Sequence, residues 1–308
     1  MDSFDELNNY VSVKKKDFES CINVVEHNLK IESIDANLRF HYIKFNGNGV
    51  PMIKNLAEKL YEYIIDYCIA SKNRGGELTN QQFLRLTKQA RSLFRHPDIN
   101  DDVSDKTGEA GEALLFFLME AVLGAPQLVA KMELKTNASD EVKGSDGIHI
   151  KWNDDDKIVE FFFGESKLYK NISAALSSAF KSIDEFHANE MYKHEFNIVT
   201  KHFKYANNEI RNAVTDLIIS GEPGENVRIN HACLIGYDWK GFSELKSTRE
   251  IPLSESFLTA FRDDLPRIHG LINKKFESFS KKELKFDVFF IPFPSVSEFR
   301  NEFNRALD

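Results

Sequence analysis

The chain has 308 residues, of which 42% are hydrophobic and 29% are charged. This balance is typical of a globular protein with a sizeable core and excludes a disordered or low-complexity chain. The 40 Lys and Arg residues against 48 Asp and Glu residues give a formal net charge of −8, which excludes a protein that coats nucleic acid by bulk charge. Any polyanion must therefore be held by a local cationic surface or through a partner.

The N-terminal third is predicted to contain two strands followed by two helices. β-Branched and aromatic residues recur with partial alternation in the strands, whereas apolar residues recur at spacings of three and four in the helices. We expect the strands over Cys21 to Leu29 and Leu38 to Phe45, and the helices over Met52 to Ile69 and Asn80 to Phe94.

A polar stretch from His96 to Asp105 separates these elements from the rest of the chain. Polar clusters between periodic segments are typical of loops. We expect the chain to divide here into an N-terminal α/β region of residues 1–104 and a core of residues 105–308 on which that region packs.

The predicted core starts with a helix over Thr107 to Leu123, which Gly124 and Pro126 terminate. Strands and further helices then follow one another. The strands are expected over Leu128 to Leu134, Ser145 to Trp152, Lys157 to Phe163, Phe196 to Thr200, Arg228 to Tyr237 and Phe286 to Pro292, and the helices over Ile172 to His187, Asn207 to Ile219, Ser254 to Phe279 and from Val296 onward. This alternation predicts an α/β fold with a mixed or parallel sheet covered by helices.

The cysteines and the apolar runs exclude several classes of protein. Cys21, Cys68 and Cys233 are odd in number, far apart and without a CxxC motif, so we expect buried, reduced thiols rather than a disulfide framework or a zinc knuckle. The acidic N-terminus lacks the features of a secretory signal. The longest apolar run near the middle, Ala113 to Met119, is far shorter than the roughly 20 residues of a membrane span. We therefore expect a cytoplasmic protein without a membrane segment.

Glu165 and Lys167 stand at the end of an apolar run, Ile158 to Phe163. Because residues two apart share one face of a strand, both side chains are expected on the same side. An acid-x-lysine tripeptide recurs elsewhere in this charged chain, so the spacing alone fits a structural ion pair as well as it fits catalysis. Their position favours a function, because charged groups at the exit of a buried strand carry a desolvation cost.

Asp146 is predicted to join the same face through a β-hairpin. If Ser145 to Trp152 pairs with Lys157 to Phe163 through the four residues 153–156, Asp146 lies opposite Phe163, and a slip of one residue would move it to the other face. Two carboxylates that converge with an ammonium can hold Mg²⁺ or Mn²⁺ with water and a phosphate. They can also stabilise the charge on a phosphodiester undergoing hydrolysis.

The preceding helix offers two further carboxylates, Glu109 and Glu112, which share one helix face. Two glutamates in a first turn also complement the helix dipole, and this explanation is preferred for Glu109. Glu112 lies deeper in the helix, so we expect it to complete the metal shell, with Glu109 as the fallback. His149 alternates to the face opposite Asp146, where packing or hydrogen bonding is expected rather than metal ligation.

These motifs, in this order, resemble the PD-(D/E)xK nuclease fold of restriction endonucleases and recombination nucleases. More narrowly, the segments GEAGEALLFFLME, KGSDGIHI, FFFGESKLYKNISAAL and FDVFFIPFPSVSEFR are similar to the nuclease subunit of the Hachiman anti-phage defence system. The resemblance covers most of the chain after Thr107 and extends less securely to the Leu38 to Phe45 strand and its following helix. Ser145 stands where the first proline of the motif is expected.

The resemblance implies a restriction-endonuclease-like mixed sheet flanked by helices, with an N-terminal α/β extension. By this likeness Asp146, Glu165 and Lys167 correspond to the D…ExK residues, and Glu112 to the helix glutamate. The implied activity is metal-dependent cleavage of DNA, with Asp146, Glu165 and Glu112 holding Mg²⁺ or Mn²⁺ and Lys167 orienting the attacking water. The implied partner is a helicase subunit of the DExD/H type, which restrains or directs the nuclease.

Two alternatives and a possible DNA surface remain open from the residues alone. The chain could be a non-catalytic subunit that keeps the fold and binds DNA or a helicase, although the intact acidic residues and lysine speak against this. The substrate could also be RNA, because phosphate chemistry is common to both nucleic acids. Lys143, Lys151 and Lys170 are candidates to line a DNA-binding groove, although each is also an ordinary solvated lysine by composition.

Overall fold

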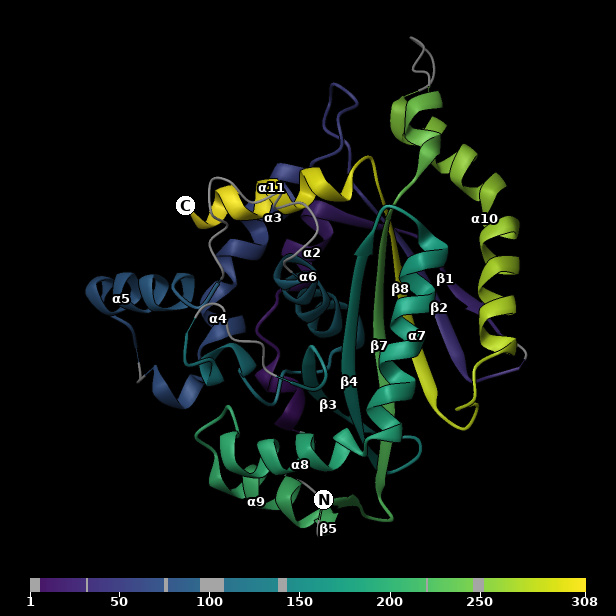
Figure 1. Ribbon diagram of the computed structural model, residues 1–308. Helices are drawn as coiled ribbons and strands as arrows, with labels where there is room; N and C mark the ends of the chain where they lie inside the picture. The colour runs from purple at the N-terminus through teal and green to yellow at the C-terminus, as the bar shows by residue number, and fades with distance from the viewer. Residues whose placement is uncertain are drawn as a thin grey trace.

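A six-stranded mixed β-sheet lies at the centre of the protein (Figure 1). The computed structural model describes residues 6–31, 33–74, 77–94, 108–137, 143–219, 221–245 and 252–308. The strands of this sheet are β1 (Ile22–Lys30), β2 (Ala36–Ile43), β3 (Gly147–Asn153), β4 (Ile158–Tyr169), β7 (Val227–Asp238) and β8 (Lys285–Phe293). They are arranged in the order β1-β2-β8-β7-β4-β3. The four inner strands are parallel, and each edge strand is antiparallel to its neighbour.

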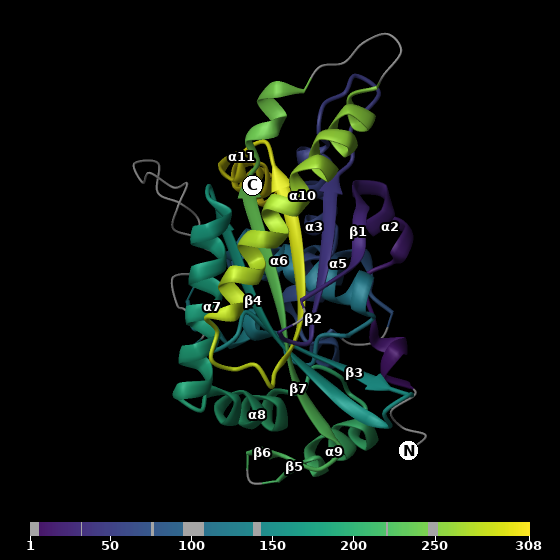
Figure 2. The same cartoon turned by 90° about the vertical axis from the view of Figure 1, so that its right-hand side faces the viewer.

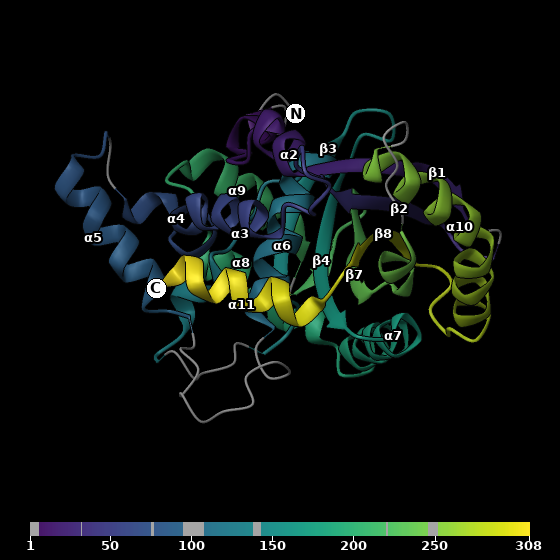
Figure 3. The same cartoon turned by 90° about the horizontal axis from the view of Figure 1, so that it is seen from above.

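Helices cover both faces of this sheet, as the two rotated views show (Figures 2 and 3). One face carries α7 (Ile172–Ala188) and α10 (Leu253–Glu277), and the other carries α3 (Ile53–Glu62), α6 (Glu109–Leu118) and α11 (Val296–Leu307). The molecule therefore has three layers, with the sheet in the middle. The predicted α/β fold with a mixed sheet flanked by helices is confirmed.

The strand β8 illustrates why both faces need a helical layer. Its sequence KFDVFFIPF is buried along almost its whole length. Phe286, Val288 and Phe290 pack into the apolar cluster beneath α7 and α10, whereas Phe289 and Ile291 pack into the cluster beneath α3, α6 and α11. A continuous apolar run of this kind is typical of a parallel strand that is buried on both faces.

Shorter elements complete the fold. They are the helices α2 (Lys15–Cys21), α4 (Ile64–Cys68), α5 (Asn80–Arg91), α8 (Met191–His202) and α9 (Asn208–Asp216), the 3-10 helices η1 (Glu6–Tyr10), η2 (Ser71–Asn73), η5 (Lys131–Leu134) and η6 (Lys240–Glu244), the π-helical turn η4 (Met119–Leu123), and the small antiparallel pair β5 (Ile218–Ile219) and β6 (Glu222–Pro223). The helices α8 and α9 pack over β3 and β4 in a third apolar cluster. The helix α5 projects from the body of the protein (Figures 1 and 3).

Two of the predicted strands are wrong. The segment Leu128 to Leu134 contains η5, after a single β-bridge between Gln127 and His149, and Phe196 to Thr200 lies inside α8. Most apolar residues of both segments are buried, but none of them lies in a strand. A short apolar run fits a buried strand and a buried helix equally well, so the neighbouring layers decide between them.

Several predicted boundaries also move. The helix expected over Met52 to Ile69 is divided, because α3 ends at Glu62 and α4 begins at Ile64. The helix expected to reach Ile219 ends at Asp216, and Ile219 belongs to β5. At the end of η4, Gly124 adopts a left-handed φ of 64°, which is the helix-terminating role predicted for it.

The N-terminal region contributes directly to the central sheet. The strand β2 pairs with β8 in parallel, with Leu38 opposite Val288, and α3 packs against α11 from the C-terminus (Figure 1). The loop predicted over His96 to Asp105 lies outside the described residues. The division of the chain into residues 1–104 and 105–308 stays a prediction.

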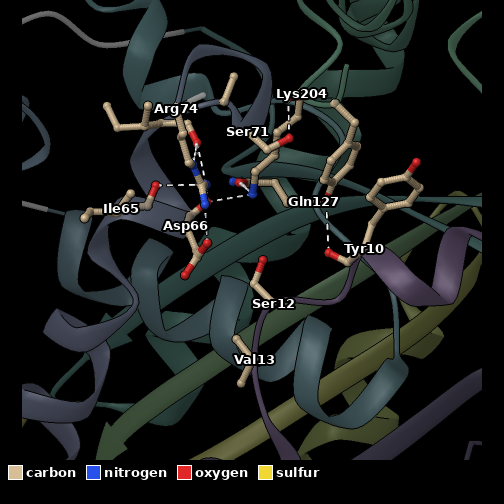
Figure 4. A network of polar contacts seen from close by, with 12 residues as sticks. Tyr10, Ser12, Val13, Ile65, Asp66, Ser71, Arg74, Gln127 and Lys204 are labelled. Carbon is tan, nitrogen blue, oxygen red and sulfur yellow. Dashed lines mark hydrogen bonds and ion pairs between the residues drawn. The ribbon is translucent and has the colours of Figure 1, made fainter. Parts of the chain in front are cut away.

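A buried polar network joins the segments beside α4 and α8 (Figure 4). The side chain of Lys204 is fully buried and donates to the carbonyl of Asp66 at 2.6 Å and to Gln127 Oε1 at 2.9 Å. Burial lowers the pKa of Lys204 to about 8, although Glu120 opposes this shift. Arg74 reaches the carboxylate of Asp66 from the other side. These contacts satisfy the buried cation, so the network is structural in character.

The three cysteines, Cys21, Cys68 and Cys233, are buried and free, as expected. Within the described ranges, no helix combines the length and the apolar character that crossing a membrane requires.

Candidate active site

The hairpin formed by β3 and β4 carries the candidate residues. Gly147 pairs with Gly164, so the register continued by one residue puts Asp146 opposite Glu165. The backbone N–H of Asp146 donates to the carbonyl of Gly164 at 2.8 Å. The predicted pairing of Asp146 with Phe163 is therefore wrong by two residues. Because the faces of a strand repeat every two residues, Asp146 nevertheless lies on the predicted face.

The hairpin turn explains this shift in register. The side-chain oxygen of Asn153 accepts hydrogen bonds from the backbone N–H groups of Asp155 and Asp156, both at 3.1 Å, which is a turn typical of asparagine. Lys157 then adopts a left-handed φ of 56°. Regular pairing consequently resumes only at Ile158, opposite Asn153.

Glu165 and Lys167 lie inside β4, which continues to Tyr169 instead of ending at Phe163. Their side chains form an ion pair, with 2.6 Å between Lys167 Nζ and Glu165 Oε1. Glu165 is only 8% exposed. Burial lowers the pKa of Lys167, but the negative charges around it, chiefly Glu165 and also Asp146, together raise the pKa above its usual value, so the ammonium keeps its proton.

The carboxylate of Asp146 is held by the residue between these two. Its Oδ2 accepts hydrogen bonds from the backbone N–H of Ser166 at 2.6 Å and from the Ser166 hydroxyl at 2.9 Å. Ser166 is itself buried. The two bonds fix Asp146 at the centre of the Glu165-Ser166-Lys167 segment.

The helix α6 packs directly against this hairpin and brings Glu112 to it. A Cβ atom on Gly111 would lie 3.0 Å from the hydroxyl oxygen of Ser166, so glycine permits the close approach of helix and strand. The Glu112 carboxylate accepts a hydrogen bond from the hydroxyl of Tyr67 at 3.2 Å. The alternative helix residue, Glu109, forms an ion pair with Lys135 at 2.6 Å.

The charge of Asp146 acts on two neighbouring carboxyl groups, those of Glu112 and Glu165. Burial raises the pKa of Glu112 to about 8, and the charge of Asp146 adds to the effect. Burial likewise raises the pKa of Glu165 to about 7, with Asp146 adding to the shift and Lys167 and Ser182 opposing it. A divalent cation with oxygen ligands would relieve this repulsion, so the donor chemistry fits Mg²⁺ or Mn²⁺.

A cavity of about 290 Å³ opens beside these groups between β4, the loop before β3 and α7. Its described lining includes Asp146, Glu165, Lys167, Ser182, Glu185 and His231. The structure thus brings two of the predicted carboxylates and the predicted lysine to one cavity. Glu112 is not among the described lining residues and approaches Asp146 from the α6 side.

Residues 18–307 match the family model of HamA. The chain belongs to the HamA family. This membership indicates a role in Hachiman defence, and the match covers both the N-terminal strands and the hairpin with Asp146. No curated protein has a sequence similar enough to this chain to count as a match.

The site of this HamA-family protein supplies carboxylate ligands but not a complete set of protein ligands for a metal ion. In the part of the chain that the structure describes, no three His, Cys, Asp or Glu side chains converge as a metal-binding group. Mg²⁺ usually retains several waters and binds through one or two carboxylates together with substrate phosphates. Asp146 and Glu165 fit that limited donor set, and Glu112 is close enough to Asp146 to influence the charge of the site.

A buried ion pair holds the loop in front of Asp146, and sequence reasoning missed it. Glu195 of α8 is fully buried and accepts from Lys131 Nζ at 2.9 Å and from the backbone N–H of Ser145 at 2.7 Å. Lys131 Nζ also donates to the carbonyl of Ser145 at 2.5 Å. A Cβ atom on Gly144 would lie 1.8 Å from the Glu195 carboxylate. The sequence offered one indication of this ion pair, an acidic residue directly before an apolar segment. Because that segment was predicted as a strand and is in fact part of α8, the position of Glu195 could not be inferred.

The lysines predicted to contact nucleic acid lie in different places in this HamA-family protein. Lys170 is exposed just after β4 and lines a second cavity. Lys143 is exposed in the loop before Asp146, and Lys151 is half-buried in β3. Neither of these two lines the first or the second cavity.

His149 occupies the sheet face opposite Asp146, where it was predicted. Its Nδ1 lies 2.7 Å from the carbonyl of Ala125, and its ring packs near Phe116. Burial lowers the pKa of His149 to about 3. A neutral, hydrogen-bonded ring in the core is consistent with packing rather than with metal ligation.

Proposed function

We propose that this protein is a metal-dependent nuclease that hydrolyses DNA phosphodiester bonds in Hachiman defence, on a restriction-endonuclease-like variant of the PD-(D/E)xK fold. One observation carries the proposal: Asp146, Glu165 and Lys167 open on the same cavity. Asp146 raises the pKa of Glu165 and so weakens the Glu165–Lys167 ion pair. An ion pair that served stability alone would not need this additional carboxylate. The family membership and the order of the motifs support the same conclusion.

The proposed metal ligands are Asp146 and Glu165, with Glu112 acting directly or through a bound water. The carboxylate of Asp146 is oriented by its two hydrogen bonds to Ser166. A bound Mg²⁺ or Mn²⁺ would lower the pKa of a water and stabilise negative charge on the phosphate. The residues of this chain supply the oxygen ligands and hold them in place.

Lys167 is proposed to orient the attacking water and to offset charge that develops on the phosphate. Its ammonium keeps its proton because of the neighbouring Glu165 and lies at the wall of the cavity. A fixed cation in a partly desolvated site stabilises a transition state more strongly than one in bulk water. Lys167 therefore contributes chiefly to the rate of the chemical step.

The proposed partner is a DExD/H-type, HamB-like helicase subunit. The net charge of −8 disfavours tight binding of free DNA, because sequence-independent affinity depends on lysine and arginine contacts to phosphates. A helicase that holds the DNA would supply the missing contacts. It would also restrain cleavage until the DNA is engaged.

The decisive experiment compares the purified chain, alone and with the neighbouring helicase, on linear and circular DNA in Mg²⁺, Mn²⁺ or EDTA. Asp146→Asn, Glu165→Gln and Lys167→Met should each lower the rate of metal-dependent cleavage by about 100-fold or more. Lys54→Met, which changes an exposed lysine of α3 outside the cavity, should retain full cleavage. Cleavage at the wild-type rate in the three site variants would refute the nuclease proposal. Absence of cleavage by every protein and condition would favour a non-catalytic subunit that keeps the fold.

A further inference from the structure

A second cavity, of about 510 Å³, lies at the C-terminal end of β4 and shares Lys167 with the first. Its described walls come from β4, the start of α6, the start of α7 and α11. Lys167 therefore stands between the two cavities. A ligand that fills one of them is next to any ligand in the other.

The two cavities differ sharply in charge. The first is lined by the carboxylates of Asp146, Glu165 and Glu185. The described lining of the second contains Lys167, Lys170 and Arg300 and no Asp or Glu. Lys167 is paired with Glu165 at 2.6 Å, so the exposed Lys170 at the rim supplies the positive charge that a polyanion can reach.

The cationic side chains of this second cavity differ in their exposure to solvent. Arg300 of α11 is 8% exposed, and its Nη2 donates to the carbonyl of Leu168 at 2.7 Å, which fixes the guanidinium at the wall. Lys170 is exposed at the rim. A fixed guanidinium and a mobile ammonium together can hold a phosphate by directed hydrogen bonds and by charge.

An aromatic ring lies at the same rim. Tyr169 is 40% exposed, and its hydroxyl lies 3.2 Å from the hydroxyl of Ser178 in α7, which restricts the ring. Exposed aromatic rings beside cationic grooves are the usual platforms on which unpaired bases stack. The volume of the cavity is within the range that accommodates a small organic ligand.

We propose that this second cavity binds the nucleotide adjacent to the cleaved bond, with its phosphate against Lys170 and Arg300 and its base against Tyr169. This inference rests on the proposed nuclease function, because it places the strand so that its scissile phosphate reaches Lys167. The second cavity would then hold the DNA backbone next to the cleaved bond, and the first cavity would hold the scissile phosphate. A base that stacks on Tyr169 must be unpaired, so the ligand is a single-stranded or locally opened DNA segment.

The test measures binding of a fluorescent single-stranded DNA oligonucleotide by anisotropy at several salt concentrations, with Ca²⁺ in place of Mg²⁺. Lys170→Gln should weaken binding severalfold and reduce the slope of log K against log salt by about 0.7, the value for one single-strand phosphate contact. Tyr169→Leu should weaken binding on the order of tenfold without changing the slope. Tyr169→Phe keeps the ring and should bind normally.

Lys54→Gln is the matched charge control, because Lys54 is exposed on α3 and lies outside both cavities. Affinity and salt slope unchanged in Lys170→Gln would overturn the inference. Equal losses in Lys170→Gln and Lys54→Gln would also overturn it, because they would show diffuse attraction instead of a site. These outcomes are independent of cleavage, so a failure of the nuclease proposal appears separately, in the Asp146→Asn, Glu165→Gln and Lys167→Met reactions.

Discussion

The carboxylate of Asp146 accepts two hydrogen bonds from Ser166, one from the backbone N–H at 2.6 Å and one from the hydroxyl at 2.9 Å. Ser166 separates Glu165 from Lys167 in β4. Ser166 is the variable position of the Glu-x-Lys motif, yet it connects the two strands of the hairpin. The position of Asp146 relative to Glu165 depends on this link as well as on strand pairing.

Replacing Ser166 by alanine should separate these two contributions. Ser166→Ala keeps the backbone N–H donor and removes the hydroxyl, so we expect a loss of about 1 kcal/mol in the free energy of unfolding and a several-fold loss of cleavage rate. Urea denaturation and a cleavage assay measure the two effects. Ser278→Ala, which removes an exposed hydroxyl that lines neither cavity, should change neither. A Ser166→Ala protein with wild-type cleavage would show that the backbone bond alone orients Asp146.

Lys167→Met should lower the turnover rate more than it lowers DNA affinity. The charge of Lys167 is proposed to act mainly in the transition state, and loss of one such group costs on the order of 10²-fold in rate. Single-turnover cleavage and anisotropy binding separate the two quantities. Equal losses in rate and affinity would assign Lys167 to substrate binding instead.

The raised pKa values of Glu112, about 8, and Glu165, about 7, predict how stability depends on pH. The carboxyls of the unfolded chain titrate near the usual 4.5, so the unfolded state loses these protons first as the pH rises. The free energy of unfolding should therefore fall between about pH 4.5 and pH 8 in EDTA. Denaturation curves across this range measure the effect. Asp146→Asn should weaken the dependence, because it removes the charge that adds to both shifts.

Mg²⁺ should counteract this loss of stability. The ion binds deprotonated carboxylates, so it should raise the melting temperature more at pH 8.5 than at pH 6. Thermal unfolding in EDTA and in Mg²⁺ at the two pH values tests this expectation. Glu165→Gln is the control and should reduce the Mg²⁺ effect. An identical Mg²⁺ effect in the wild-type protein and in this variant would argue against a metal at Glu165.

Glu195→Gln should destabilise the protein and disturb the site together. The substitution leaves the buried ammonium of Lys131 without its carboxylate, and breaking a buried ion pair costs about 3 kcal/mol or more. Glu58→Gln breaks an exposed pair with Lys54 and should change the free energy of unfolding by less than about 0.5 kcal/mol. Combining Glu195→Gln with Lys131→Met should recover part of the lost stability. No recovery in that double variant would show that Glu195 acts through Ser145 alone.

The sequence by itself determined the features that depend on local periodicity. The strand predicted over Phe286 to Pro292 corresponds to β8, and the helix predicted up to Gly124 contains α6. The shared face of Glu165 and Lys167 followed from their two-residue spacing. Asp146 reached the predicted face despite the wrong register, because an error of two residues returns to the same face of a strand.

The tertiary structure decided the features that depend on distant contacts. The short apolar segment after Glu195 became a helix because it packs over β3 and β4, and no local pattern distinguishes that outcome from a strand. The pairing of Glu195 with Lys131 joins residues 64 positions apart, and Arg300 reaches the carbonyl of Leu168 across 132 positions. Local periodicity determines on which face of a strand or helix a side chain lies. The residue that it contacts there is determined only when the helices pack against the sheet.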